Sequence, residues 1–167
     1  MKITENMIQQ TLAKKFFNDF FVCNKFYSDF EADFLRVTSA GFLYEYEIKI
    51  SLSDFRNDFK KECTDRYRRG EAILKHDMIR SGALSIKHFY FCAPAGIIPV
   101  EEVPEDFGLW EFNREGDYQQ LFMKEVQKPK SLSDHKVDRK FKLRFMEKTY
   151  WDYKHRMCEK AKGEWIK

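Results

Sequence analysis

The sequence predicts an α/β protein in which helices flank a mixed β-sheet. Three observations support this prediction. Two strand-like runs over residues 31–38 and 42–50, separated by a short stretch that ends in glycine, predict an antiparallel hairpin. A near-continuous apolar run at residues 86–93 has the composition of a central strand that is covered on both faces. A strand, a crossover and another strand then give a parallel pair, so the sheet is parallel or mixed.

The composition is that of a globular chain. Its 167 residues suffice for one domain with its own core, and 17 Phe, 8 Tyr and 3 Trp supply large side chains to fill it. The four cysteines form no Cys-x-x-Cys pair, which argues against a zinc ribbon or a disulfide scaffold and favours a reducing cytoplasm. No apolar run approaches the ~20 residues of a membrane span, and no secretory signal is evident, so we expect a soluble cytoplasmic protein without membrane contact.

Charge divides the chain unevenly. Residues 121–167 contain 14 Lys/Arg against 7 Asp/Glu, a net charge of +7, which leaves −4 for residues 1–120. A basic region behind an acidic body suits contact with a polyanion, although a solvated charged helix gives the same pattern. The Lys-Pro-Lys run at 128–130 predicts a linker. We therefore expect a core over residues 1–127 and a basic C-terminal helical extension over residues 128–167 that packs on it.

Helical and extended patterns follow one another along the core. Thr4 is a candidate N-cap for an amphipathic helix over residues 5–21, and residues 21–26 could form a short edge strand. After the hairpin, Ser51 or Ser53 begins a second helix, which the four-residue spacing of its apolar positions extends to about Gly70. The remaining expected elements are a helix or lid-like loop over 71–84, the strand 86–93, a short turn or helix over 100–106, a last strand over 108–112 and a tail helix capped by Ser133 or Asp134.

The length of the hairpin turn decides which side chains share a face. With a two-residue loop, Asp33 would lie opposite Ile48 and place a carboxylate on the apolar face. With the three-residue loop 39–41, Gly41 takes the left-handed position that this class of turn favours, and Asp33 lies opposite Glu47. The match in polarity favours the longer loop.

This register gathers ionic side chains on one face of the hairpin. Glu31 falls opposite Lys49, next to the pair of Asp33 and Glu47, while Glu45 lies further along the strand. Crowded carboxylates repel one another unless a cation compensates, and Mg²⁺ or Mn²⁺ takes carboxylate oxygens as ligands. A lysine beside them can orient a water or stabilise charge on a phosphate. A solvated strand face gives the same Glu-x-Lys pattern, so the residues alone leave both interpretations open.

Asp33, the turn, the Glu47-Ile48-Lys49 run and the helix directly after it resemble the core of the PD-(D/E)XK nuclease superfamily, which has the restriction-endonuclease-like fold. The resemblance implies that Asp33, Glu47 and the carbonyl of Ile48 ligate Mg²⁺ or Mn²⁺ and that Lys49 assists the attacking water. It makes Glu31 a further candidate ligand or water-holding residue. The implied activity is hydrolysis of DNA.

The stretch from residue 31 to residue 112 is more narrowly similar to small bacterial and phage members of that superfamily, some of them linked to DNA repair. DNA repair or phage DNA processing is therefore the setting that the resemblance implies. Ala32 stands where the motif name has proline, and the superfamily core usually has a strand before the position of Glu31.

Basic side chains of the second half of the core are candidates for contact with DNA phosphates. These residues are Lys60, Lys61, Arg66, Arg68, Arg69, Lys75 and Arg80. A non-catalytic nucleic-acid-binding module that keeps the nuclease fold is the alternative to a nuclease. An interaction protein whose acidic face recruits a basic partner is a third hypothesis. The sequence leaves the oligomeric state open, a homodimer included.

Overall fold

The computed structural model describes residues 2–28, 30–64, 72–114 and 121–164 of the chain. Two compact units are formed, Met1–Lys136 and Val137–Lys167. Among the described residues, every strand lies in the first unit, and the second contains one long helix, α4 (Arg139–Glu164). The sequence predicted the boundary after residue 127. The boundary between the two units instead follows Lys136. That the extension packs on the core stays a prediction.

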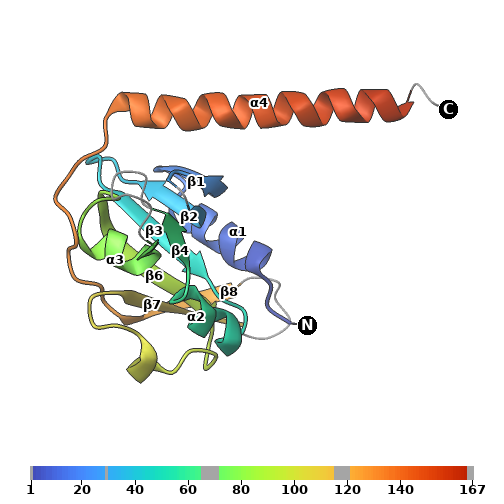
Figure 1. Ribbon diagram of the computed structural model, residues 1–167. Helices are drawn as coiled ribbons and strands as arrows, with labels where there is room; N and C mark the ends of the chain where they lie inside the picture. The colour runs from blue at the N-terminus through green and yellow to red at the C-terminus, as the bar shows by residue number, and fades with distance from the viewer. Residues whose placement is uncertain (1, 29, 65–71, 115–120, 165–167) are drawn as a thin grey trace. The chain divides into compact units, whose positions relative to one another are not determined.

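A six-stranded mixed sheet forms the centre of the first unit (Figure 1). Its order is β1-β2-β3-β6-β7-β8, in which β6 and β7 run parallel to β3 and all other neighbours are antiparallel. The predicted α/β class, with a mixed sheet flanked by helices, is confirmed. The bounds are β1 (Phe20–Phe26), β2 (Glu31–Val37), β3 (Leu43–Ile48), β6 (Ile86–Pro94), β7 (Gly108–Arg114) and β8 (Leu121–Gln127).

Helix α1 (Glu5–Lys15) begins as predicted and ends earlier than predicted. The Oγ1 of Thr4 accepts a hydrogen bond from the N–H of Met7 at 3.4 Å, which is an N-cap. The predicted continuation to residue 21 is wrong, because Phe20 already starts β1. Asp19 holds the connection in place, since its carboxylate accepts hydrogen bonds from the side chain of Arg36 and the N–H of Ser39. The possible edge strand near residues 21–26 is confirmed.

The hairpin of β2 and β3 has the register that the three-residue turn predicts. Phe34 pairs with Tyr46 and Leu35 with Glu45, the register in which Asp33 and Glu47 are the next two residues, directly beyond the last pair. Gly41 has a φ of 90°, in the left-handed region where a glycine avoids the strain that a Cβ would bring. The expected register and turn are therefore both confirmed.

The helix after the hairpin is shorter than the sequence suggested. Ser51 caps α2 (Leu52–Asp58) by accepting a hydrogen bond from the N–H of Asp54, as predicted. The chain leaves the helix at Phe59 and forms β4 (Glu62–Thr64), which pairs with β5 (Ala72–Leu74) in a separate two-stranded sheet. The predicted helix to Gly70 is therefore wrong, because pairing with β5 satisfies the backbone where the helix was expected to continue.

Later elements agree in part with the prediction. Helix α3 (Lys75–Arg80) and a short 3₁₀ helix, η1 (Val100–Glu102), lie within the expected ranges, and strand β6 extends one residue beyond the predicted range. Strand β8 was missed, so β7 is not the last strand. The residue that caps α4 is Asp138, whose Oδ1 accepts a hydrogen bond from the N–H of Phe141 at 2.8 Å. Ser133 instead accepts from the N–H of His135 in a local turn.

Both faces of the central sheet are buried. On one face α1 contributes Ile8, Leu12 and Phe16 to a cluster that includes Phe34 and Tyr46. On the other face the aromatic residues of α2, α3, β6 and the loop before β7 pack together: Phe55, Phe59, His76, Phe89, Phe91 and Phe107. The ionic side of β3 therefore lies in the interior. Among the helices of the described residues, none is long and apolar enough to cross a membrane.

Candidate functional site

The ionic side chains of β3 and the residue after it are buried. Glu45, Glu47 and Lys49 are 0%, 1% and 2% exposed, respectively. The Glu-x-Lys pattern is therefore not that of a solvated strand face. Ionised groups lose a large hydration energy when they are buried, so such an arrangement persists only where partners compensate each charge.

Two carboxylates hold the ammonium group of Lys49. Its Nζ lies 2.8 Å from Oε1 of Glu47 and 2.7 Å from Oδ1 of Asp58, which α2 contributes. The same two oxygens bind Lys61, whose Nζ lies 2.7 Å and 2.6 Å from them. Burial opposes the charge of Lys49, but Glu47 and Asp58 outweigh it and raise its pKa above the ordinary value. Lys49 is thus an ammonium ion at every physiological pH.

A third lysine approaches the network from α3. The Nζ of Lys75 lies 2.7 Å from Oε1 of Glu45 and 2.8 Å from Oε2 of Glu47, and the side chain is 0% exposed. The hydroxyl of Tyr27 donates to Oε2 of Glu45 at 2.5 Å. Burial disfavours the carboxylate of Glu47, yet Lys75, Lys49 and Lys61 lower its pKa overall. The pKa of Lys75 is likewise raised and that of Asp58 lowered, so the shifts of Glu47, Asp58, Lys49 and Lys75 all favour the charged forms.

Asp33 stands apart from these ion pairs. Its Oδ2 accepts a hydrogen bond from the N–H of Ile48 at 2.7 Å. Burial raises the pKa of Asp33 to about 7, and the nearby charges of Glu47 and Glu5 add to the rise, while the Ile48 N–H and Lys49 oppose it. A carboxyl group with a raised pKa beside a second carboxylate is a place where a cation would be stabilised.

The raised pKa of Asp33 predicts a pH-dependent gain in stability on Asp33→Asn. The folded state binds more protons than the unfolded state between pH 3.8 and about 7, so the aspartate lowers stability progressively as the pH rises through this window. A pKa difference of one corresponds to about 1.4 kcal/mol, so the gain in stability is at most about 4 kcal/mol. Partial solvent access reduces the expected gain to roughly 2 kcal/mol at pH 8. The gain vanishes near pH 4.

Urea denaturation at pH 4, 6 and 8, with a chelator present, measures this gain. Glu31→Gln is the matched control, because Glu31 is an exposed carboxylate at the start of the same strand. A gain at pH 8 that does not exceed that of the control contradicts the assignment.

The donor atoms near Asp33 are of the type that Mg²⁺ binds. Asp33 and Glu47 supply carboxylate oxygens, and Mg²⁺ is commonly held by one or two carboxylates with several waters. No group of three or more His, Cys, Asp or Glu side chains placed to hold a metal ion occurs within the described part of the chain. A Mg²⁺ or Mn²⁺ ion held by Asp33 and Glu47 would therefore keep several waters among its ligands. Glu47 would have to exchange a lysine contact for the ion.

The other predicted site residues are dispersed. Glu31 is exposed, and Lys60 is exposed and donates to the side chain of Asn57. Lys61 belongs to the buried network but remains 41% exposed. Arg80 pairs with Asp106 at 2.7 Å. The contact of Lys60, Lys61 and Arg80 with DNA stays a prediction, as does the role of Glu31 as a ligand or water-holding residue.

Lys75 and three arginines were also predicted to contact DNA phosphates. Lys75 is buried between Glu45 and Glu47 and cannot reach a phosphate in this conformation, so the expectation that it contacts DNA is corrected. Arg66, Arg68 and Arg69 lie outside the described residues.

Sequence reasoning missed the residues that complete the network. Asp58 and His76 were not assigned to it, and Glu45 was placed away from the site. Asp58 follows Phe55 by three residues, so the helical period that placed Phe55 in the core also put Asp58 on that face. No comparable pattern in the sequence indicated that Tyr27 would contact Glu45 or that Glu5 would lie near Asp33.

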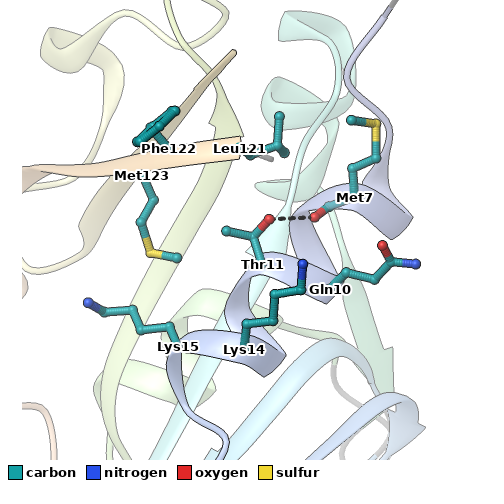
Figure 2. Close-up of a pocket in the computed structure, with 8 residues that line it drawn as sticks. All are labelled: Met7, Gln10, Thr11, Lys14, Lys15, Leu121, Phe122 and Met123. Carbon is teal, nitrogen blue, oxygen red and sulfur yellow. Dashed lines mark hydrogen bonds between the residues drawn. The ribbon is translucent and has the colours of Figure 1, made fainter. Parts of the chain in front are cut away.

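A separate groove of about 430 Å³ lies between α1 and β8 (Figure 2). Its lining combines apolar side chains with two lysines and contains none of the predicted site residues. The lining residues are Met7, Gln10, Thr11, Lys14, Lys15, Leu121, Phe122 and Met123.

Comparison with known proteins supports the fold alone. No protein-family model and no curated protein matches the sequence. Among solved structures, SPO1766, a protein of unknown function from Silicibacter pomeroyi, is similar with a TM-score of 0.56 and 13% sequence identity. The likeness covers 94% of this chain and 91% of that chain. The fold and the site together define the class: an α/β protein with a buried ion-pair network on its central hairpin.

Proposed function

We propose that this chain is a metal-dependent nuclease that hydrolyses phosphodiester bonds in DNA. One observation carries the proposal: Asp33 and Glu47 directly adjoin the Phe34 and Tyr46 pair that ends the pairing of β2 with β3, and the ammonium of Lys49 lies 2.8 Å from Glu47. Two facing carboxylates and a permanent cation are the groups that metal-assisted phosphodiester hydrolysis uses.

The order of elements supports the resemblance to the PD-(D/E)XK superfamily. Strand β1 precedes Glu31 and pairs with β2, and it stands where the superfamily core usually has a strand. The hairpin leads at once into a capped helix, and the next strand of the sheet, β6, runs parallel to β3. The same resemblance makes DNA repair or phage DNA processing the proposed setting.

The residues of this chain would hold the metal ion and place a positive charge beside it. A divalent ion, when bound, supplies Lewis acidity toward the phosphate and lowers the pKa of water. Asp33 and Glu47 would hold that ion with the carbonyl of Ile48. Because the pKa of Lys49 is raised, Lys49 does not accept a proton and serves as a hydrogen-bond donor that stabilises charge on the phosphate or orients the water.

An assay of DNA cleavage tests the proposed function. Purified protein should cut at least one form of DNA, single-stranded, duplex or flapped, in Mg²⁺ or Mn²⁺ and should stop on addition of a chelator. Calorimetry with Mn²⁺ should show binding with release of a proton at pH 6, because the ion favours the ionised form of Asp33. Absence of both cleavage and Mn²⁺ binding contradicts the proposal.

One observation favours a non-catalytic DNA-binding module instead. Both oxygens of Glu47 already pair with lysines, so the network is neutralised without a metal ion. Such a module would bind DNA in a salt-sensitive way that survives the chelator. Binding without cleavage in the same assay would select this function.

A further inference from the structure

Lys49 is held by two carboxylates, and only one of them belongs to the motif on β3. The second, Asp58, is the last residue of α2 and is 1% exposed. Its Oδ1 lies 2.7 Å from the Nζ of Lys49, and its Oδ2 lies 2.9 Å from the Nε2 of His76. Asp58 thus joins the motif lysine to a histidine on α3.

The hydrogen bond between His76 and Asp58 has a defined direction. His76 and the lysines near Asp58 lower its pKa despite burial, so its carboxylate is ionised and only accepts hydrogen bonds. The Nε2 of His76 therefore carries a proton and donates it. The imidazole acts as a fixed donor that orients Asp58.

Aromatic side chains fix the ring of His76. It makes edge contacts with Phe59, Phe89, Phe91 and Phe107, with centroid distances from 4.7 to 5.8 Å, and it is 3% exposed. A ring packed on several sides cannot turn without displacing its neighbours. The chain His76, Asp58, Lys49 is consequently pre-organised by the core on the α2 and α3 side of the sheet.

We propose that Asp58, braced by His76, is the positioning residue that fixes the ammonium of Lys49 for the reaction. This inference rests on the proposed nuclease function, since it gives the orienting partner of the lysine in that site. Glu47 would be drawn toward a bound metal ion, so Asp58 would be the partner that retains Lys49. Groups that orient a reacting side chain through a second hydrogen bond commonly change activity 10- to 100-fold when they are lost.

Three substitutions separate positioning from mere charge compensation. Asp58→Asn keeps the shape but replaces one carboxylate oxygen with an NH₂ group, so that either Lys49 or His76 faces a donor in place of an acceptor. His76→Phe keeps an aromatic ring and removes the donor, whereas His76→Gln restores a donor of similar reach. The control is Asp54→Asn, the same chemical change at an exposed position on the same helix.

The first readout needs neither metal nor DNA. In ¹⁵N-labelled protein the ammonium of Lys49, identified by its loss in Lys49→Arg, should give a slowly exchanging NMR signal because it is buried and held by two carboxylates. We expect this signal to disappear in Asp58→Asn, to weaken in His76→Phe, and to persist in His76→Gln and Asp54→Asn.

The second readout is the split between kcat and KM for DNA cleavage. We expect kcat to fall about 10- to 100-fold in Asp58→Asn and about tenfold in His76→Phe, with KM within about twofold of the wild type and recovery in His76→Gln. If Asp58→Asn does not fold, His76→Phe decides. Wild-type signal and wild-type kcat in His76→Phe overturn the proposal. If no variant, the wild type included, cleaves DNA while the NMR pattern follows expectation, the nuclease function fails and the bracing of Lys49 is upheld.

Discussion

Lys49→Met is expected to lower metal-dependent DNA cleavage by about 100- to 1,000-fold. The methionine side chain has a similar length and removes the buried ammonium group that Glu47 and Asp58 hold. Loss of one pre-organised donor to a developing negative charge typically costs this factor. Fold loss is not the expected cause, because Lys61 still compensates the same two oxygens.

Initial rates at saturating Mg²⁺ measure this effect, and thermal melting verifies that the variant is folded. Lys14→Met, an exposed lysine of α1, controls for a general loss of positive charge. A Lys49→Met variant that cleaves at the rate of this control would remove Lys49 from the site. Asp33→Asn should lose cleavage in the same experiment while its unfolding free energy rises, and this opposite movement distinguishes a strained functional carboxylate from a structural one.

Lys75→Met is expected to destabilise the folded protein by about 3–5 kcal/mol. The substitution leaves the carboxylates of Glu45 and Glu47 buried beside each other without the ammonium that lies between them. Breaking a buried ion pair by removing one partner has this typical cost, because the remaining charge stays unhydrated. Urea denaturation at pH 7 gives the free energy of unfolding directly.

An exposed ion pair provides the control for Lys75→Met. Lys130 and Glu105 lie 2.8 Å apart, with both side chains more than half exposed, so Lys130→Met should change stability by less than about 1 kcal/mol. The double variant Glu45→Gln/Lys75→Met should recover part of the loss, since it removes the buried charge of Glu45 that Lys75 compensated. Equal effects of Lys75→Met and Lys130→Met would show that the buried contact contributes little.

The sequence allowed the central hairpin to be predicted because its signals are local. The alternation along β3 and the position of Gly41 depend on a few neighbouring residues, and together they determine that Asp33 lies opposite Glu47. The buried network could not be predicted in the same way. Lys75 lies 28 residues from Glu47 in sequence, and only the packing of α3 on the sheet brings the two together.

The errors in the predicted secondary structure have a similar origin. The apolar spacing of Phe55, Phe59 and Cys63 fits a helix, but pairing with β5 takes the chain into β4 after Asp58. Strand β8 has side chains of mixed polarity, and its pairing with β7 gives it a place in the sheet. In the first case a tertiary contact overrides the local helix propensity. In the second it determines a strand that the local propensity leaves undecided.

The turn between β2 and β3 has a consequence for how this protein can change. Surface turns usually tolerate insertions and deletions, because few contacts depend on their length. Here the loss of one residue from 39–41 would slip the strands by one position and carry Asp33 to the apolar face, away from Glu47. Substitutions within the turn leave the site intact as long as Gly41 or another residue accepts the left-handed conformation. The length of this turn is therefore constrained, whereas its residues can change as long as the left-handed position is kept.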